Sequence, residues 1–393
     1  MSGEAAAGLS GVRFTVEHRD SSSSARTGVL ELGHGPVETP VFMPVGTNAT
    51  VKAIPHELLE AMEVRILLCN AYHLYLRPGA EVLGACGGLH SFMSWRRNIL
   101  TDSGGYQIFS LAAKRTIEEQ GAVFRSHLDG SQHRLSPEDV VDFQLLLGSD
   151  LLMPLDLCTP PGISAAEAAE ALERTARWAA RSLNRWRAVS EGSKGCLFGI
   201  IQGNFFPDLR RRSAELTLEL GFPGYAIGGL SVGESFPVFQ ELLALSAGMI
   251  PESLPRYLMG VGTPEYILEA VGSGIDMVDC VFPTRTARNA QAFTRSGTLS
   301  LKNEANRLSR EAIDPTCLCP TCRRYSRAYL RHLYKSREIL AATLATQHNL
   351  YFLQNLMRAI RNAIREDRFA RFKREFLDLY KSDLDKAEQN AEQ

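Results

Sequence analysis

Three aspartates stand at the ends of short apolar runs, where carboxylates can do nucleophilic or acid–base chemistry. Asp102 and Asp156 each follow such a run directly, and Asp279 lies at the end of a third. Two carboxylates that face one ligand can divide the work, one attacking and the other transferring protons, if their environments separate their pKa values. A third, with an amide and backbone groups, can bind the polar edge of a planar ligand. A single strand-end aspartate often caps the next helix, but three beside glycines favour one shared site.

Three cysteines and a histidine form a second constellation. Cys317-x-Cys319-x-x-Cys322 is followed 26 residues later by His348. Three thiolates and one imidazole complete a tetrahedral zinc shell without a position for water, so the pattern predicts one structural Zn²⁺ per chain. His332 is a competing fourth ligand. It lies only ten residues past Cys322 in a basic stretch, which favours a surface or nucleic-acid-facing position.

Positive charge gathers around the cysteine cluster. The formal net charge of the chain is −1, but residues 281–393 hold 21 Lys and Arg against 12 Asp and Glu. Such a basic region indicates either solvated helix faces or a local contact with a polyanion. Basic residues with interleaved tyrosine suit a phosphate backbone and stacked bases. The residues near the cluster are Arg323, Arg324, Tyr325, Arg327, Arg331, Lys335 and Arg337.

Eight short apolar runs must position these groups. They are continuous rather than alternating, as expected for strands that are covered on both faces. Eight strand–helix units in about 280 residues predict a TIM (β/α)₈ barrel, in which function lies beyond the carboxyl ends of the strands. A doubly wound open sheet is the alternative, weakened because no GxGxxG loop follows the first run. The runs are Val41–Val45, Arg65–Cys69, Ile99–Thr101, Leu151–Leu155, Leu197–Ile201, Tyr225–Ile227, Tyr257–Val261 and Asp276–Cys280.

Helix signals and composition agree with a large α/β domain. Ser136 and Thr263 each precede a proline and acidic residues, as at helix N-termini, and Ser164–Val189 predicts a long amphipathic helix. A further helix is expected over Asn349–Arg365, and a turn or hairpin tip over Ser21–Ser24. No apolar run reaches the roughly 18 residues of a membrane span, and no signal-peptide pattern opens the chain. We therefore expect a cytoplasmic protein whose eight cysteines serve metal binding or chemistry rather than disulfides.

Several motifs, in order, resemble the tRNA-guanine transglycosylases, and the bacterial branch fits best. They are TDSGGYQ, GIIQG, AIGGLSVGE, YLMGVGTPE, GIDMVDCVFPTRTARN and the CxCxxC…H cluster, and the resemblance extends from about Phe14 to Arg374. It implies a TIM barrel with a zinc subdomain. It also implies an enzyme that exchanges the wobble guanine of certain tRNAs for a 7-deazaguanine without breaking the RNA chain.

The resemblance also implies roles for individual residues. Asp279 matches the family's nucleophile, which forms a covalent intermediate with the ribose, and Asp102 matches the general acid and base. The residues that match the base-binding site are Asp102, Ser103, Gly104, Gly105, Tyr106, Asp156, Gln202, Gly229, Leu230 and Met259. Those that match the tRNA-contacting stretches are Gly260, Val261, Gly262, Thr263, Pro264, Glu265 and Tyr266, and Thr284, Arg285, Thr286, Ala287 and Arg288.

The identity of the incoming base depends on few positions. Val232 and Cys158 match the bacterial pattern, which implies 7-aminomethyl-7-deazaguanine, because a valine would fill the room that the ring of queuine needs. Glu234 could hold the Leu230–Ser231 peptide toward an ammonium group. Leu157 departs from the family, which usually has an acidic residue there, and this leaves queuine as an alternative incoming base.

The resemblance implies a division of the chain and a homodimer in which one subunit holds tRNA while the other catalyses. We expect a catalytic barrel over 1–287, a zinc-binding and tRNA-contacting subdomain over 288–350, C-terminal helices over 351–380 and a polar tail over 381–393. Three other classes of protein share some of these features. A non-catalytic tRNA-binding subunit or a purely structural zinc and RNA module would not need both Asp102 and Asp279, and a carboxylate glycosidase would not need the zinc site.

Overall fold

A barrel of parallel strands forms the centre of the protein. The structure is a computed structural model and describes residues 12–111 and 114–380. Each of the eight predicted runs contains a strand, and Asp102 and Asp279 lie at the carboxyl ends of two of them. In the run Leu151–Leu155 the strand ends at Leu152, so Asp156 lies in the loop that follows and not at the strand end. The strands are β4 (Val41–Pro44), β5 (Ile66–Asn70), β6 (Asn98–Asp102), β10 (Leu151–Leu152), β11 (Cys196–Leu197) with β12 (Gly199–Ile201), β13 (Tyr225–Ile227), β14 (Arg256–Leu258) and β15 (Met277–Cys280).

Hydrogen bonds close these strands into a barrel, as the run pattern predicted. One set has the order β11-β10-β6-β5 and the other β12-β13-β14-β15-β4. A parallel bridge between Val45 and Leu68 joins β4 to β5. At the other junction, β11 and β12 are two parts of one run on either side of Phe198. The Phe198 amide donates to the Leu152 carbonyl of β10, and the Gly199 amide donates to the Gly224 carbonyl before β13. This closure excludes the open doubly wound sheet.

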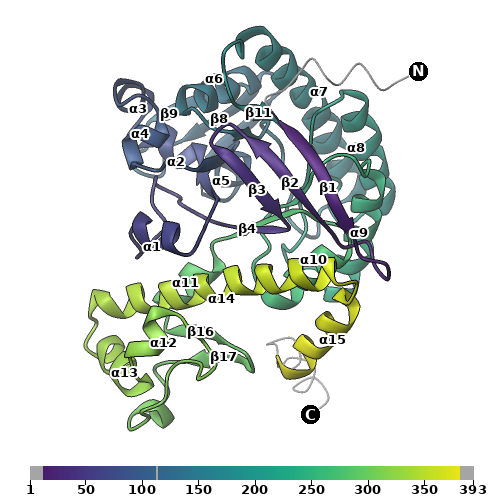
Figure 1. Ribbon diagram of the computed structural model, residues 1–393. Helices are drawn as coiled ribbons and strands as arrows, with labels where there is room; N and C mark the ends of the chain where they lie inside the picture. The colour runs from purple at the N-terminus through teal and green to yellow at the C-terminus, as the bar shows by residue number, and fades with distance from the viewer. Residues whose placement is uncertain (1–11, 112–113, 381–393) are drawn as a thin grey trace.

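Helices cover the outside of the barrel (Figure 1). Ser136 is an N-cap residue, as predicted, and closes a capping box with Asp139. Ser164, where a helix was expected to start, is also an N-cap residue and closes a capping box with Glu167. Thr263 is also an N-cap residue, but its side chain makes no capping hydrogen bond. The helices are α1 (His56–Ala61), α2 (Ala71–Leu76), α3 (Ala80–Ala85), α4 (Leu89–Met93), α5 (Gly105–Leu111), α6 (Pro137–Leu147), α7 (Ala165–Val189), α8 (Pro207–Glu219), α9 (Phe236–Met249), α10 (Pro264–Gly272) and α11 (Phe282–Arg288).

An antiparallel sheet covers the amino-terminal end of the barrel. It consists of β1 (Arg13–Arg19), β2 (Arg26–Leu32) and β3 (Gly35–Thr39), and β3 leads directly into the start of β4. Its Leu30 and Val37 pack with the side chains that fill the barrel interior. Ser21–Ser24 lies at the hairpin tip, as predicted. Because this end is closed, ligands can approach the barrel interior only from the carboxyl ends of the strands.

A second antiparallel sheet lies between β6 and α6 and was not predicted. It contains β7 (Arg115–Glu118), β8 (Gly121–Arg125) and β9 (Gln132–Leu135). Phe124 and Leu135 bury its inner face together with Trp178 of α7. The insertion therefore stands at the end of the barrel where Asp102 lies.

The C-terminal part carries the cysteine cluster and packs on the barrel through one long helix (Figure 1). α14 was predicted from Asn349 but begins ten residues earlier, so the expected boundary between residues 350 and 351 falls inside it. The tail over 381–393 lies outside the described residues. None of the described helices has the length and apolarity to cross a membrane. The elements are β16 (Gln291–Thr294), β17 (Gly297–Ser300), a 3₁₀ helix (Glu304–Asn306), α12 (Pro320–Arg324), α13 (Arg327–Lys335), α14 (Ile339–Arg365) and α15 (Phe369–Leu379).

Candidate active site and metal centre

Asp102 is the last residue of β6 and is buried within a set of hydrogen-bond donors. The side-chain amides of Asn70 and Gln107 donate to Asp102 Oδ2, and the distance from Gln107 is 3.0 Å. The backbone amide of Ala71 donates to Oδ1 at 2.9 Å. Burial raises the pKa of Asp102 to about 6 although these donors oppose the rise, and the charge of Asp279 raises it further. A carboxyl with such a pKa can both give and take a proton near neutral pH.

Asp279 lies at the end of β15 and is held on one side only. The Tyr257 hydroxyl donates to Oδ1 at 2.6 Å and the Gly260 amide donates to the same oxygen at 2.9 Å. Burial raises the pKa of Asp279, and the two donors lower it. The pKa of Tyr257 is raised well above its usual value by burial, so its phenol stays a neutral donor. Within the described residues no group donates to Oδ2, which leaves this oxygen available to attack a ligand.

The two carboxylates belong to one region of the barrel end. β15, β4, β5 and β6 are consecutive strands, and both aspartates stand at their carboxyl ends. The charge of Asp279 acts on the pKa of Asp102, so the two groups are within electrostatic reach. The two carboxyl groups have different environments: both donors to Asp279 use one of its oxygens, whereas the pKa of Asp102 is raised to about 6.

Asp156, Gln202 and Ser103 form a hydrogen-bonded wall beside this pair. The Gln202 side-chain amide donates to Asp156 Oδ2 at 2.7 Å and the Ser103 hydroxyl donates to Oδ1 at 3.2 Å. Burial raises the pKa of Asp156. A Cβ atom on Gly105 would lie 2.6 Å from an Asp156 oxygen, and one on Gly229 would lie 2.6 Å from Gln202 Oε1. Both glycines are therefore required by close packing against the wall.

The remaining predicted contact residues differ in exposure. Tyr106 is 54% exposed and Met259 is half-buried, so the tyrosine ring and the thioether are accessible to solvent, while Leu230 is buried. Arg285 is exposed. Four of the predicted tRNA-contacting residues are buried, so their side chains pack beneath these segments and are not accessible to a ligand. They are Val261, Pro264, Thr284 and Ala287. Tyr266 packs on Phe236 and Phe239, with ring centroids 5.0 and 4.6 Å away.

Sequence reasoning did not assign a role to several residues that shape the site. Asn70 and Gln107 hold Asp102, and Tyr257 holds Asp279. Asn70 carried a weak signal as a polar residue at the end of an apolar run. Tyr257 carried none, because a tyrosine in a buried strand is ordinary core by composition.

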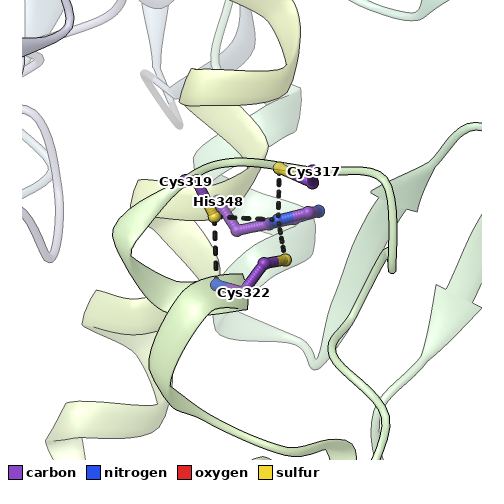
Figure 2. Close-up of side chains that lie close together, drawn as sticks. All are labelled: Cys317, Cys319, Cys322 and His348. Atoms are coloured by element: carbon purple, nitrogen blue, oxygen red, sulfur yellow. Dashed lines mark hydrogen bonds between the residues drawn. The ribbon is translucent and has the colours of Figure 1, made fainter.

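Cys317, Cys319, Cys322 and His348 converge on one point (Figure 2). His348 Nδ1 lies 3.8, 3.4 and 3.3 Å from the three sulfurs, and tetrahedral zinc bonds would place sulfur and nitrogen about 3.6 Å apart. Nε2 of His348 donates to the Phe293 carbonyl at 2.6 Å, which leaves the Nδ1 lone pair for a metal. The cluster can hold a metal and fits zinc. His332, the competing ligand, is exposed on α13.

A second group, His34, His90 and Asp150, was not predicted and lies under the amino-terminal end of the barrel. His34 Nδ1 lies 2.7 Å and His90 Nε2 3.3 Å from the buried Asp150 carboxylate. The imidazole rings are stacked with centroids 3.9 Å apart, whereas two imidazoles on one tetrahedral ion stand about 5 Å apart. The geometry is that of hydrogen bonds which tie the β2–β3 turn to the barrel.

The fold and the two sites define a barrel protein with buried carboxylates at the carboxyl ends of its strands and a subdomain whose Cys₃His cluster can hold a metal. A family model described as Queuine tRNA-ribosyltransferase matches residues 20–382. The queuine tRNA-ribosyltransferase of Desulforapulum autotrophicum is 51% identical over 92% of this chain and 98% of its own length. Those of Caldanaerobacter subterraneus and Desulforudis audaxviator are 50% and 52% identical over 95% and 93% of this chain, and each match covers 98% of the relative.

The chain therefore belongs to the queuine tRNA-ribosyltransferase family. It is a pentosyltransferase of the tRNA-guanine transglycosylase class, and tRNA is the substrate of this family.

Proposed function

We propose that the protein exchanges the wobble guanine of tRNAs with GUN anticodons for 7-aminomethyl-7-deazaguanine, a step of queuosine biosynthesis. The observation that carries this is the difference between the two buried aspartates. In Asp279 both donors bond Oδ1 and leave Oδ2 free, whereas the pKa of Asp102 is raised to about 6. Incubation with unmodified tRNA and labelled guanine, with each 7-deazaguanine as competitor, tests it. Failure to exchange guanine would refute the proposal. A preference for queuine would show that queuine, not 7-aminomethyl-7-deazaguanine, is the incoming base.

The reaction follows as a double displacement. Asp279 Oδ2 attacks the anomeric carbon, the bond to guanine N9 breaks, and Asp102 gives a proton to the leaving base. The incoming base then attacks the same carbon through N9, its N9 proton goes to Asp102, and Asp279 leaves as a carboxylate. The covalent intermediate conserves the energy of the glycosidic bond, so the exchange needs no nucleotide or redox cofactor.

Base recognition is proposed for the wall that adjoins this pair. Asp156 accepts hydrogen bonds from N1–H and the 2-amino group of guanine, a bidentate arrangement that a carboxylate favours. Gln202 and the Gly229 amide face the 6-oxo oxygen. Tyr106 and Met259 enclose the ring, which suits a base taken out of the RNA stack. The exposure of Tyr106 supports this assignment, because an accessible aromatic ring can stack on a base that enters from solution.

Glu234 supports the aminomethyl base as the substrate. Its carboxylate accepts hydrogen bonds from the Ser231 amide and, at 3.0 Å, from the Val232 amide. Because the carbonyl and N–H of a trans peptide point in opposite directions, the Leu230 carbonyl is turned away from Glu234 and can accept a bond from an ammonium group. Leu157, where the family usually has an acid, packs instead with the apolar cluster around Trp178.

Val232→Gly is expected to improve the use of queuine at least about tenfold relative to the aminomethyl base, because removal of the side chain makes room for the cyclopentenediol ring. Competition between the two bases in the exchange assay measures the ratio. An unchanged ratio would show that side-chain size at this position does not select the base.

The Cys₃His cluster is proposed to hold one structural Zn²⁺. Cys319→Ser is expected to reduce bound zinc from one equivalent to a small fraction and to lower the melting temperature by at least about 5 °C, since metal binding and folding are coupled. Elemental analysis and thermal unfolding measure both. Cys86→Ser, at an exposed free cysteine, is the matched control and should change neither. A zinc-free wild type with the same melting temperature would contradict the assignment.

The RNA is proposed to lie across the exposed end of the barrel and the basic subdomain. Gly260–Tyr266 and Thr284–Arg288 border Asp279, and Arg323 and Arg324 extend the positive surface along residues 288–350, with the helices over 351–380 as its support. A homodimer, with one subunit holding tRNA while the other catalyses, completes the proposal. Sedimentation of the protein with and without tRNA tests the stoichiometry.

A further inference from the structure

Arg210 is a fully buried arginine in the first turn of α8, and its guanidinium lies against backbone carbonyls. Nε donates to the Asn204 carbonyl at 2.9 Å, and Nη2 donates to the carbonyls of Gly228 and Gly229 at 3.1 Å each. No ion pair within the described residues includes Arg210, and Nη1 has no hydrogen-bond partner there. Burial lowers its pKa to about 10, so the group stays charged at neutral pH. A buried charge without a direct ion pair is costly, so the hydrogen bonds to these carbonyls stabilise the guanidinium, and the charge of Glu234 acts on it from a longer distance.

The geometry of the peptide bond converts this contact into an arrangement of donors. A trans peptide is planar, with its carbonyl and the following N–H in opposite directions. When Arg210 holds the Gly228 carbonyl, the Gly229 N–H of the same peptide points away from the guanidinium. When it holds the Gly229 carbonyl, the Leu230 N–H points away in the same manner. No hydrogen bond within the described residues uses either amide. The same stretch packs against the Gln202 side chain, which donates to Asp156.

We propose that Arg210 is a positioning residue that fixes the Gly229 and Leu230 amides as donors to the 6-oxo oxygen of the guanine-type base. This inference rests on the proposed function, since it assumes that the wall around Asp156 binds the base edge. The guanidinium does not touch the base. It acts through two peptide groups, and Glu234 fixes the next peptide in the loop through the Ser231 amide.

The neighbouring residues supply a control. Arg210, Arg211 and Arg212 are consecutive, but Arg211 and Arg212 are exposed and pair with carboxylates at the surface. Arg211→Met therefore removes the same charge from the same helix without affecting the carbonyls of Gly228 and Gly229.

The test compares three bases as inhibitors of the exchange catalysed by the full-length, metal-loaded enzyme. 6-Thioguanine keeps N1–H and the 2-amino group but replaces the oxygen by sulfur, a weaker acceptor. Hypoxanthine keeps the oxygen and lacks the 2-amino group that Asp156 would bind. We expect wild type and Arg211→Met to bind guanine about tenfold more tightly than 6-thioguanine. In Arg210→Met and Arg210→Lys this ratio should fall toward one, while the ratio of guanine to hypoxanthine stays as in wild type.

Two results would overturn the inference. The guanine to 6-thioguanine ratio could stay unchanged in the Arg210 variants, or both ratios could fall together, as a general loss of structure would cause. Arg210→Lys carries the test if Arg210→Met does not fold, because an ammonium keeps the charge but lacks the planar guanidinium that donates to three carbonyls. A wild type that does not prefer guanine to hypoxanthine would instead refute the proposed base site, and this outcome is read from the wild type alone.

Discussion

Asp279→Asn is expected to abolish the covalent enzyme–RNA adduct and to lower the rate of base exchange by about 10⁴-fold or more, as removal of a nucleophile does in other covalent enzymes. The neutral amide cannot attack the anomeric carbon. Its oxygen can still accept the hydrogen bonds that Tyr257 and the Gly260 amide make to Asp279 Oδ1. The fold should therefore remain, and the loss should be chemical. Denaturing electrophoresis of enzyme incubated with tRNA measures the adduct.

Tyr257→Phe is the matched control for this experiment. It removes one donor to Asp279 but keeps the nucleophile, so the adduct should still form, at a lower rate. An adduct of undiminished yield in Asp279→Asn would show that another group attacks the ribose. If Tyr257→Phe and Asp279→Asn lost activity equally and also lost their cooperative unfolding transitions, the effect would be structural and the assignment of the nucleophile would fail.

Asp102→Ala is expected to slow exchange by about 10²- to 10⁴-fold, the range for loss of a general acid–base group. The wild-type half-reactions should respond to pH in opposite directions around the pKa of about 6. Release of guanine needs the protonated carboxyl and slows as pH rises through 6, while entry of the new base needs the carboxylate and becomes faster. Single-turnover measurements of each half-reaction should show these limbs in wild type and not in the variant. Unaltered turnover would remove Asp102 from the proton transfers.

The same pKa predicts the sign of a stability effect. Because burial raises the pKa of Asp102 in the folded chain, protonation favours the folded state, and that contribution is lost as pH rises from the unfolded value near 4 through about 6. Asp102→Ala removes the titrating carboxyl group. The variant should therefore lose activity at pH 8 but should not show the loss of stability with rising pH that wild type shows over this window. Thermal unfolding at pH 5 and pH 8 measures the difference.

Local patterns were sufficient where a single element decides its own structure. Ser136 and Ser164 are followed by acids three residues on, and both close capping boxes. The eight continuous apolar runs are barrel strands because a strand that is buried on both faces must be apolar throughout. The spacing of Cys317, Cys319 and Cys322 brings three sulfurs together within a short stretch of chain, so this part of the cluster was predictable from local pattern. His348, the expected fourth member 26 residues further on, joins them from α14.

Elements that are stabilised by distant partners were missed. The sheet β7–β8–β9 is short, and its Phe124 and Leu135 are buried by Trp178 of α7, which follows later in the chain. The first ten residues of α14 were not predicted, because Ala341, Leu344 and Ala345 pack in the core of the metal-binding subdomain and show no amphipathic period on their own. Propensity is a weak guide when tertiary packing decides the structure.

The sequence alone determined the barrel, the Cys₃His cluster and the positions of Asp102 and Asp279 at strand ends, because these follow from periodicity and spacing along the chain. Only the tertiary structure decided how the groups differ. It placed both donors on one oxygen of Asp279 and raised the pKa of Asp102 to about 6. It also buried Arg210 while leaving Arg211 exposed. Burial, hydrogen bonding and electrostatic interaction act through space between residues far apart in the chain, and no local pattern encodes them.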